Sequence, residues 1–289
     1  MEFNLEINGL TKAYKKSDFN LKEVSFSVPK GAIMGFVGEN GSGKSTTINC
    51  ILNVLIKDCG SIKLFGEEVG EDTIHTRDDI GVVFDTNAFA GYLTPKNIAT
   101  AMKPIYTNWN DALFISYLEK LKLPFKKKIS TFSRGMTMKL GLAVALAHQP
   151  KLLILDEATG GLDPIVRDEV LDIFLDFVQD ENHSILVSSH ITSDLEKIAD
   201  YITFIHDGEI VLTKAKDDLI YNHGLMRLKQ AQFDEMDQED IISFRRRDYQ
   251  IDVLVQDKGV MERKYRDVVM DDISIEEVML MIVKGERPS

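Results

Sequence analysis

The sequence has few cysteines, more acidic than basic residues and no long apolar run. Of its 289 residues only Cys50 and Cys59 are cysteines, which excludes a disulfide framework and indicates a reducing compartment. Lys and Arg number 34 against 46 Asp and Glu, which gives a net charge of −12 at pH 7. A sequence-independent nucleic-acid binder would need a basic face, so no nucleic-acid partner is expected.

Membrane-spanning and secretory segments are not predicted either. Stretches without a charged residue, such as 45–56, end after about a dozen residues, whereas a membrane helix needs about 18–20. The N-terminus carries Glu2 and Glu6 where a signal peptide would carry basic residues. We therefore expect a soluble chain, for which any role at a membrane depends on a partner.

Hydropathy patterns indicate an α/β protein. The chain is 44% apolar and 28% charged, as globular proteins are. Residues 3–7 and 24–28 alternate in hydropathy, and we expect an N-terminal antiparallel β portion there. Continuous apolar runs, typical of strands buried on both faces, follow at 33–37, 80–84, 152–155, 185–187 and 201–205. Helical patterns between these runs predict a mostly parallel core sheet.

Length and pattern also predict how the chain is divided. A length of 289 residues suggests about two domains. We expect a large sheet domain at 1–214 and a small C-terminal α/β accessory domain at 215–289. Within the first, residues 86–149 are largely helical in pattern and are predicted to form a helical insertion.

The accessory domain is predicted from its own strand and helix signals. Residues 249–255 alternate as a strand. Ser274 and Glu277 have the spacing of a capping box that opens a helix, and Gly285 is expected at the C-cap of that helix.

The strongest motif directly follows the run at 33–37. Residues 38–45 read GENGSGKS and match the phosphate-binding P-loop, with a predicted strand before it and a helix after it. Its glycines let successive N–H groups point inward as an anion-binding nest, to which the helix N-terminus adds its positive end. Lys44 would reach the β- and γ-phosphates, and the Ser45 hydroxyl would bind Mg²⁺. The predicted nucleotide-binding residues are Gly38, Asn40, Gly41, Ser42, Gly43, Lys44, Ser45 and Thr46.

Two carboxylates and a histidine follow other predicted strands. Asp156 and Glu157 end the run at 152–155, at the sheet edge where open α/β proteins bind ligands. Asp156 suits the Mg²⁺ shell, and Glu157 could orient and deprotonate a water that attacks the γ-phosphate. His190 ends the next strand pattern and could donate a hydrogen bond to developing phosphate charge.

A second phosphate-binding helix end is predicted near residue 133. Ser133 is a good N-cap for the helix that contains Leu140 and Val144. The N–H groups near Gly135 would make this helix end a phosphate cradle. Because one nucleotide needs only one such cradle, the second suggests that a partner's nucleotide binds here.

With these motifs in order, the chain resembles the nucleotide-binding subunit of an ATP-binding-cassette transporter over about residues 2–214. Residues 38–45 correspond to Walker A and 152–157 to Walker B, while residues 133–136 occupy the place of the family signature. His190 resembles the switch histidine, and 161–163 the D-loop. Tyr14 lies where the family stacks an aromatic ring on adenine.

The resemblance implies a P-loop NTPase cassette that binds ATP and Mg²⁺ and hydrolyses ATP. Two cassettes, identical or merely related, would close head to tail around two ATP molecules. Each site would then pair the Walker motifs of one chain with Ser133 and Gly135 of the other. Closure would drive a separate permease of about six helices, docked on the helical insertion, at the cytoplasmic face of the cell membrane.

Two positions depart from the family pattern. Asp85 stands where the family places a glutamine that contacts Mg²⁺ and the attacking water. A shorter, charged side chain there predicts slower hydrolysis or altered coupling to the permease. Arg134 stands for a signature glycine and adds a cation near a partner's phosphates, where it either assists or crowds binding.

A single cassette with a C-terminal appendage resembles the bacterial type-2 exporters, and the signature residues Ser133 to Met136 resemble their peptide and drug efflux branch. The expected function is therefore an ATPase that powers efflux of a hydrophobic or amphipathic substrate. The alternatives are a cytosolic cassette ATPase without a membrane partner, such as one in iron–sulfur assembly, and a nucleotide-gated regulator.

Overall fold

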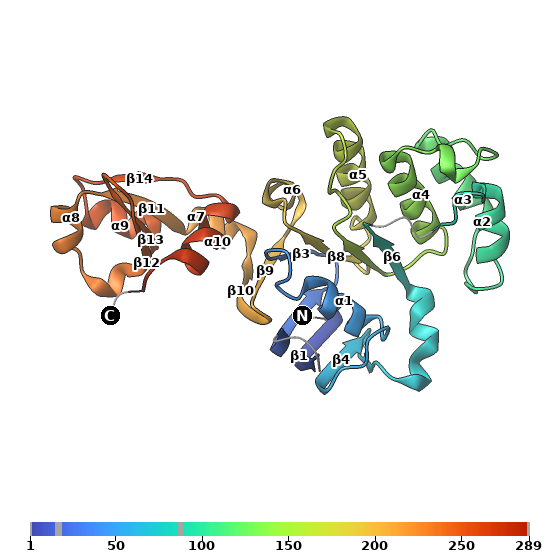
Figure 1. Cartoon of the computed structure of the whole chain (residues 1–289), viewed down its shortest axis with the longest axis horizontal. Helices are drawn as coiled ribbons and strands as arrows, with labels where there is room; N and C mark the ends of the chain where they lie inside the picture. Colours follow the sequence, from blue (N-terminus) through green and yellow to red (C-terminus); the bar gives the residue numbers. More distant parts are fainter. Residues whose placement is uncertain (1, 15–18, 86–88, 288–289) are drawn as a thin grey trace.

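A computed structural model describes residues 2–14, 19–85 and 89–287. This described part contains three β-sheets, two of them before residue 216 and one in the C-terminal region, which lies at one end of the molecule (Figure 1). Thr86, with which the predicted insertion begins, lies outside the described residues. The α/β class with a parallel core sheet is confirmed.

The N-terminal sheet is antiparallel, as expected. It has the order β2-β1-β4-β5, and Leu5 of β1 lies opposite Val28 of β2 and Leu64 of β4. Alternate side chains of these strands turn inward and are buried, so the two-residue alternation read from the sequence fits this sheet. The strands are β1 (Phe3–Ala13), β2 (Asn20–Pro29), β4 (Cys59–Leu64) and β5 (Glu67–Glu68).

The central sheet is built from the continuous apolar runs. Its order is β10-β9-β3-β8-β7-β6, in which only β10 is antiparallel to its neighbour. Every residue of β3 and β8 is buried, which explains why apolar and polar residues do not alternate along them; β8 also buries Ser184, Ser188 and Ser189. The strands are β3 (Ile33–Val37), β6 (Ile80–Phe84), β7 (Leu152–Asp156), β8 (Ser184–Ser189), β9 (Tyr201–His206) and β10 (Glu209–Ala215).

The register of the parallel strands brings distant segments to one sheet edge. Phe84 of β6 pairs with Asp156 of β7, which pairs with Ser188 of β8. On the other side of β8, Ser189 pairs with Val37, the last residue of β3. The residues that follow these strand ends therefore lie close together in space.

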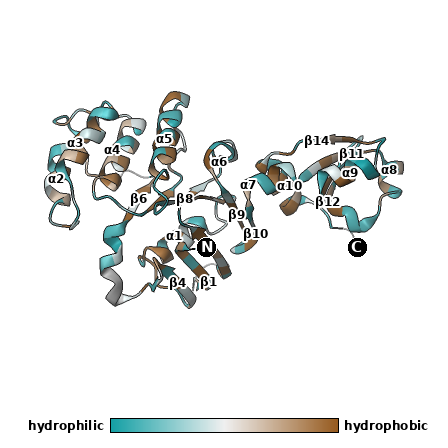
Figure 2. Ribbon diagram, turned by 180° about the vertical axis from the view of Figure 1, so that it is seen from behind, coloured by the Kyte–Doolittle hydropathy of each residue, from teal (hydrophilic) through white to brown (hydrophobic). Residues whose placement is uncertain are grey.

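Helices surround the central sheet (Figure 1). Those drawn in Figure 2 carry hydrophobic and hydrophilic sides, as seen on α5, because one side packs on the protein interior. Helix α5 begins at Pro164, directly after the N-cap Asp163, and proline is favoured at this first helical position. The helical segments before the C-terminal region are α1 (Lys44–Ile51), η1 (Glu71–Asp79), α2 (Pro95–Met102), α3 (Asp111–Lys120), η2 (Ile129–Thr131), α4 (Arg134–Leu146), α5 (Pro164–Phe177) and α6 (Thr192–Ile198).

The C-terminal region forms its own antiparallel sheet, of order β12-β13-β11-β14, around buried side chains such as Met226 and Val253. Its last helix, α10, instead joins the main core around the central sheet through Val278 and Met281. The elements are α7 (Lys216–Tyr221), β11 (His223–Leu228), α8 (Gln230–Asp234), η3 (Gln238–Asp240), β12 (Ile241–Arg246), β13 (Ile251–Gln256), α9 (Lys258–Lys264), β14 (Val269–Asp271) and α10 (Ile275–Lys284).

Both ends of α10 follow from particular side chains. The Ser274 hydroxyl accepts a hydrogen bond from the Glu277 N–H, and Glu277 in turn accepts one from the Ser274 N–H, which completes the capping box. Gly285 stands at the C-cap in an extended conformation, with φ −81°. A side chain there would crowd Ser243 of β12, so close approach rather than a left-handed turn requires glycine.

A buried histidine joins the helical region to the central sheet. The His148 ring stacks on Tyr106 with 3.9 Å between centroids, and its Nε2 lies 3.1 Å from the Ile80 carbonyl oxygen. Burial lowers the pKa of the His148 imidazole, although carbonyl groups of Ile80 and Val144 act in the opposite direction. The folded protein therefore favours the neutral ring.

We predict that His148 makes the fold sensitive to acid. Below pH about 6.5 the unfolded chain protonates this histidine while the folded chain resists, so the free energy of unfolding falls as pH falls. In His148→Gln the free energy of unfolding, measured by urea unfolding between pH 7 and 5, should lose this part of its dependence on pH. The exposed His75, substituted in the same way, is the control; equal slopes in the parent and His148→Gln would contradict the prediction.

Candidate nucleotide-binding site

The loop between β3 and α1 forms the floor of the site. Gly41 and Gly43 have φ values of 85° and 116°, which L-residues with side chains rarely adopt. A Cβ atom on Gly38 would lie 2.5 Å from the Ile205 carbonyl oxygen. The three glycines therefore allow a tight curl that ends where α1 begins, at Lys44.

Two buried polar side chains of this loop suit an anionic ligand. The Ser42 hydroxyl is buried and has no hydrogen-bond partner among the residues that the structure describes. Lys44 is only 5% exposed and brings a positive charge into the loop. Phosphate oxygens would accept a hydrogen bond from the Ser42 hydroxyl and would be attracted by the Lys44 ammonium group, so the donor set of the loop fits a nucleoside triphosphate.

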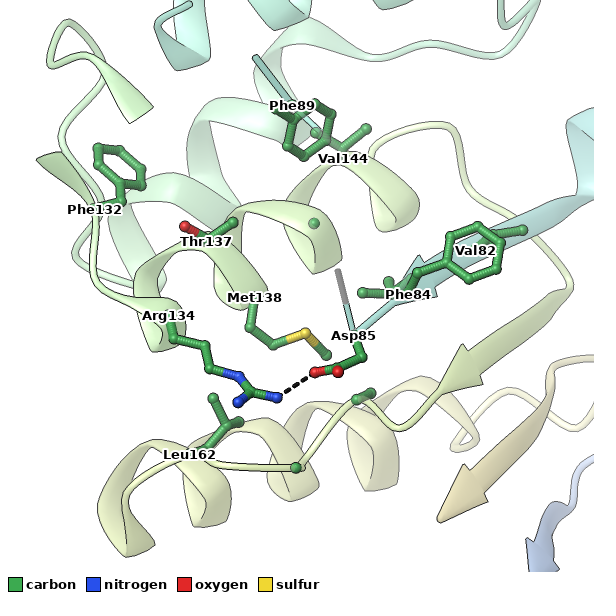
Figure 3. A pocket seen from close by; sticks show the side chains of 14 residues that line it. Val82, Phe84, Asp85, Phe89, Phe132, Arg134, Thr137, Met138, Val144 and Leu162 are labelled. Atoms are coloured by element: carbon green, nitrogen blue, oxygen red, sulfur yellow. Dashed lines mark hydrogen bonds and ion pairs between the residues drawn. The ribbon is translucent and has the colours of Figure 1, made fainter. Parts of the chain in front are cut away.

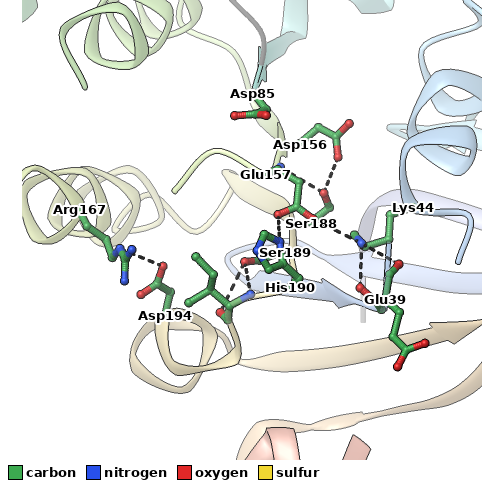
Figure 4. A network of polar contacts seen from close by, with 12 residues as sticks. Glu39, Lys44, Asp85, Asp156, Glu157, Arg167, Ser188, Ser189, His190 and Asp194 are labelled. Atoms are coloured by element: carbon green, nitrogen blue, oxygen red, sulfur yellow. Dashed lines mark hydrogen bonds and ion pairs between the residues drawn. The ribbon is translucent and has the colours of Figure 1, made fainter. Parts of the chain in front are cut away.

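Lys44 is held by the loop and by the residue that follows β7. Its Nζ donates hydrogen bonds to the carbonyl oxygens of Gly38, at 2.8 Å, and Glu39, at 3.2 Å (Figure 4). The same atom lies 3.3 Å from Glu157 Oε1. A single ammonium group thus joins the P-loop to the segment that follows β7.

Glu157 is fixed in an uncommon backbone conformation. Its φ of 54° is left-handed, which costs a residue with a side chain about 1–2 kcal/mol. Its N–H donates to the Ser188 carbonyl oxygen at 3.1 Å, and its Oε2 lies 2.5 Å from His190 Nδ1. The carboxylate is therefore held between Lys44 on one side and His190 on the other (Figure 4).

Asp156 is oriented by a serine that belongs to none of the predicted motifs. Ser188 Oγ donates a hydrogen bond of 2.5 Å to Asp156 Oδ1. The strand pattern ending in Ser188-Ser189-His190 offered a signal, because parallel strands in register bring Ser188 beside Asp156. Among the described residues no group of three or more His, Cys, Asp and Glu has the spacing to hold a metal ion.

A hollow of about 330 Å³ lies beside the loop. It is lined by Asn40, Gly41, Gly43, Lys44, Ser45, Thr46, Glu157 and Phe19. Phe19 was not predicted, although an aromatic residue just before a strand offered a signal. Tyr14 is 38% exposed, and its hydroxyl lies 3.4 Å from Thr46 Oγ1, so an aromatic side chain does stand at this edge of the P-loop.

Ser133 and Gly135 do not line this hollow within one chain. Ser133 caps α4, and its hydroxyl accepts a hydrogen bond from the Met136 N–H at 3.2 Å. Gly135 faces α5 instead, since a Cβ atom there would lie 3.2 Å from a Val166 methyl group. The structure thus brings together the P-loop, Glu157 and His190, and leaves the second helix end apart.

Asp85 and Arg134, the two residues that depart from the family pattern, form an ion pair with each other (Figure 3). Arg134 was expected to present a cation toward a partner's phosphates, but in this chain its charge is paired with Asp85. Beside the pair lies a hollow of about 300 Å³ with apolar walls that include Phe132 and Met138.

Comparisons with known proteins agree with this geometry. The family model described as ABC transporter matches residues 21–160. The lantibiotic transport ATP-binding protein SrtF of Streptococcus pyogenes is 35% identical over 74% of this chain and 91% of its own. The bacitracin transport ATP-binding protein BcrA of Bacillus licheniformis is 34% identical over 72% of this chain and 68% of its own. The chain belongs to the ATP-binding subunits of ABC transporters.

Solved structures support the membership. The structure of an ATP-binding subunit of an ABC transporter has a TM-score of 0.66 and 26% identity, over 74% of this chain and 91% of that one. The ATP-binding cassette MJ0796 bound to ADP and Pi has the same TM-score at 22% identity, which shows the fold alone. This ABC subunit is accordingly an ATP-binding protein and an ATPase.

We predict that Lys44→Met abolishes most nucleotide binding and hydrolysis. Losing a charged donor aimed at phosphate oxygens costs about 100-fold or more in turnover. ATPase rates and calorimetric ATP titration would measure the change, and circular dichroism would check folding. Lys57→Met, which alters a lysine paired with Glu68 outside the hollow, is the matched control; equal losses in both variants would contradict the assignment.

Proposed function

We propose that this chain is the ATPase subunit of an exporter that moves a hydrophobic or amphipathic substrate, such as an antimicrobial peptide or a drug. The observation that carries the proposal is the arrangement of Glu157 between the P-loop lysine Lys44 and His190. The relatives named for bacitracin, lantibiotic and linearmycin transport or resistance support the substrate class.

In this proposal Glu157 is the general base of ATP hydrolysis. Its carboxylate accepts a proton from the water that attacks the γ-phosphorus, and the bond to the ADP oxygen breaks. His190, 2.5 Å from Glu157 Oε2, orients the carboxylate. Lys44 reaches the phosphates from the buried floor and stabilises the charge on the transferred group.

Mg²⁺ is the proposed metal, and the chain's donors suit it. Ser45 and Asp156 supply the hydroxyl and carboxylate oxygens that this ion prefers, and Ser188 fixes the Asp156 carboxylate at 2.5 Å. When bound, the ion neutralises phosphate charge. Asp85 is a third proposed ligand, since it follows Phe84, the register partner of Asp156.

Two cassettes are proposed to share each nucleotide. The capped N-terminus of α4 has the N–H groups of a phosphate cradle but does not line the hollow of its own chain. In a head-to-tail pair, Ser133 and Gly135 would complete the site of the other chain, while Tyr14 would meet adenine. The other member of the pair would be either a second copy of this chain or a related cassette.

The membrane path is proposed to lie in a separate permease of about six helices, with this subunit at the cytoplasmic face of the cell membrane. In the part of the chain that the structure describes, no helix is long and apolar enough to cross a bilayer. The hollow of about 300 Å³ between β6 and α4 has apolar walls open to an incoming segment, and we propose it as the docking surface (Figure 3).

A division into cassette 1–214, with its insertion 86–149, and accessory domain 215–289 also remains our proposal. Strand β10 ends at Ala215, and a separate sheet with its own core follows. The packing of α10 on the cassette core supports an accessory domain that is attached rather than freely tethered.

We predict that Glu157→Gln slows hydrolysis by about 1,000-fold and leaves ATP binding intact, because the amide cannot take the proton. The trapped nucleotide should hold two chains together, which light scattering with ATP would detect. Glu119→Gln, on the exposed side of α3, is the control. Unchanged turnover in Glu157→Gln would refute the assigned base.

We predict further that the subunit copurifies with the membrane protein encoded beside it. Phe132→Asp, which places a charge in the apolar hollow, should lower the recovered complex by about 10-fold, because burying an unpaired charge is costly. Val269→Asp, at an exposed apolar site of the C-terminal region and outside the insertion, is the control. If no membrane protein is recovered with the parent chain, the exporter proposal is wrong and the alternative, a cytosolic cassette ATPase without a membrane partner, replaces it.

A further inference from the structure

One arginine connects three segments around the site. Arg134 is the first residue of α4, and its guanidinium donates to the carboxylate of Asp85, directly after β6. On its other side it lies against the turn after β7, since a Cβ atom on Gly161 would stand 2.8 Å from Arg134 Cζ. The pair thus fastens the start of α4 to two segments at the sheet edge (Figure 3).

Each member of this pair stands beside a position where a ligand of opposite charge is proposed. Asp85 lies one residue beyond Phe84, the register partner of Asp156, and so stands at the cation end of its own nucleotide site (Figure 4). Arg134 directly follows the cap Ser133, and so stands at the helix end that would face a partner's phosphates.

The ion pair is weak enough for Arg134 and Asp85 each to leave the other and bind a ligand instead. The side chains of Arg134 and Asp85 are 54% and 47% exposed, and ion pairs in water contribute little to stability. An arginine binds a phosphate more strongly, because the phosphate carries more charge and can accept two parallel hydrogen bonds. A carboxylate likewise binds a divalent metal ion more strongly, because it coordinates the ion directly. Either ligand can therefore replace the partner within the chain.

We propose that the Asp85–Arg134 pair is an exchange switch that couples the two nucleotide sites of a dimer. The inference rests on the proposed head-to-tail pairing of cassettes. A nucleotide with its cation in one site attracts Asp85 and frees Arg134, which then contacts the phosphates held by the other chain. By linkage, phosphate bound to Arg134 also frees Asp85 for its own site. The exchange also releases the turn at Gly161.

The test uses the full chain carrying Glu157→Gln, in which ATP-driven dimer formation is read by light scattering with and without Mg²⁺. Arg134→Gln should raise the ATP concentration for half-maximal dimerisation by about 10-fold, the loss of one charge-assisted contact. Asp85→Asn leaves Arg134 unpaired, so without Mg²⁺, where no carboxylate ligand is lost, it should lower that concentration about 3-fold and bring the Hill coefficient toward 1. The double variant should match Arg134→Gln.

A charge-swapped variant separates exchange from a structural role. Asp85→Arg combined with Arg134→Asp restores an ion pair within the chain but presents each ligand with the wrong charge, so dimerisation should weaken by at least 10-fold. The exposed pair Lys103 and Asp111, neutralised together, is the matched control and should change nothing.

Two results would overturn the proposal. A charge-swapped chain that dimerises as its parent does would make the pair structural only. Additive effects of Asp85→Asn and Arg134→Gln would show that the two residues act independently. If the parent Glu157→Gln chain stays monomeric with ATP, the proposed pairing of cassettes fails, and the exchange fails with it.

Discussion

The site depends on one carboxylate held between two cationic or hydrogen-bonding groups. Glu157 reaches Lys44 with one oxygen and His190 with the other, at 3.3 and 2.5 Å. These three residues come from segments that follow three different strands, so only the parallel register of β3, β7 and β8 can bring them together. The left-handed backbone at Glu157 shows that the surrounding structure stabilises this placement against a local cost.

The rest of the cassette maintains that register. Buried strands form the middle of the sheet, with helices packed on one face and the N-terminal sheet and α1 on the other, so a slip of one residue would exchange the side chains of the two cores. The N-terminal sheet shares a core with α1, and Leu21 of β2 lies close to Gly43 of the P-loop. Stability and chemistry therefore share the same constraint, because the core that sets the strand ends also sets the distances between Lys44, Glu157 and His190.

Local pattern was sufficient for the fold class and for much of the P-loop, since spacing and hydropathy are properties of neighbouring residues. Pairing between distant side chains was not predictable in this way. Asp85 and Arg134 were noticed separately as departures from a family pattern, and only the structure pairs them. Phe19 and Ser188 belong to no motif. The curl of the loop places Phe19 at the hollow, and the strand register places Ser188 beside Asp156. The strand order of the C-terminal sheet likewise depends on contacts far apart in sequence.

Helix α10 connects the C-terminal region to the surroundings of the nucleotide site. The Ile275 N–H at its start donates to the Glu196 carboxylate of α6, at 2.8 Å, and α6 itself begins two residues after His190. The C-terminal region is therefore connected to the helix that follows His190 by a hydrogen bond as well as by the packing of α10 on the cassette core. An accessory domain joined in this way cannot separate from the cassette without exposing buried side chains next to the nucleotide site.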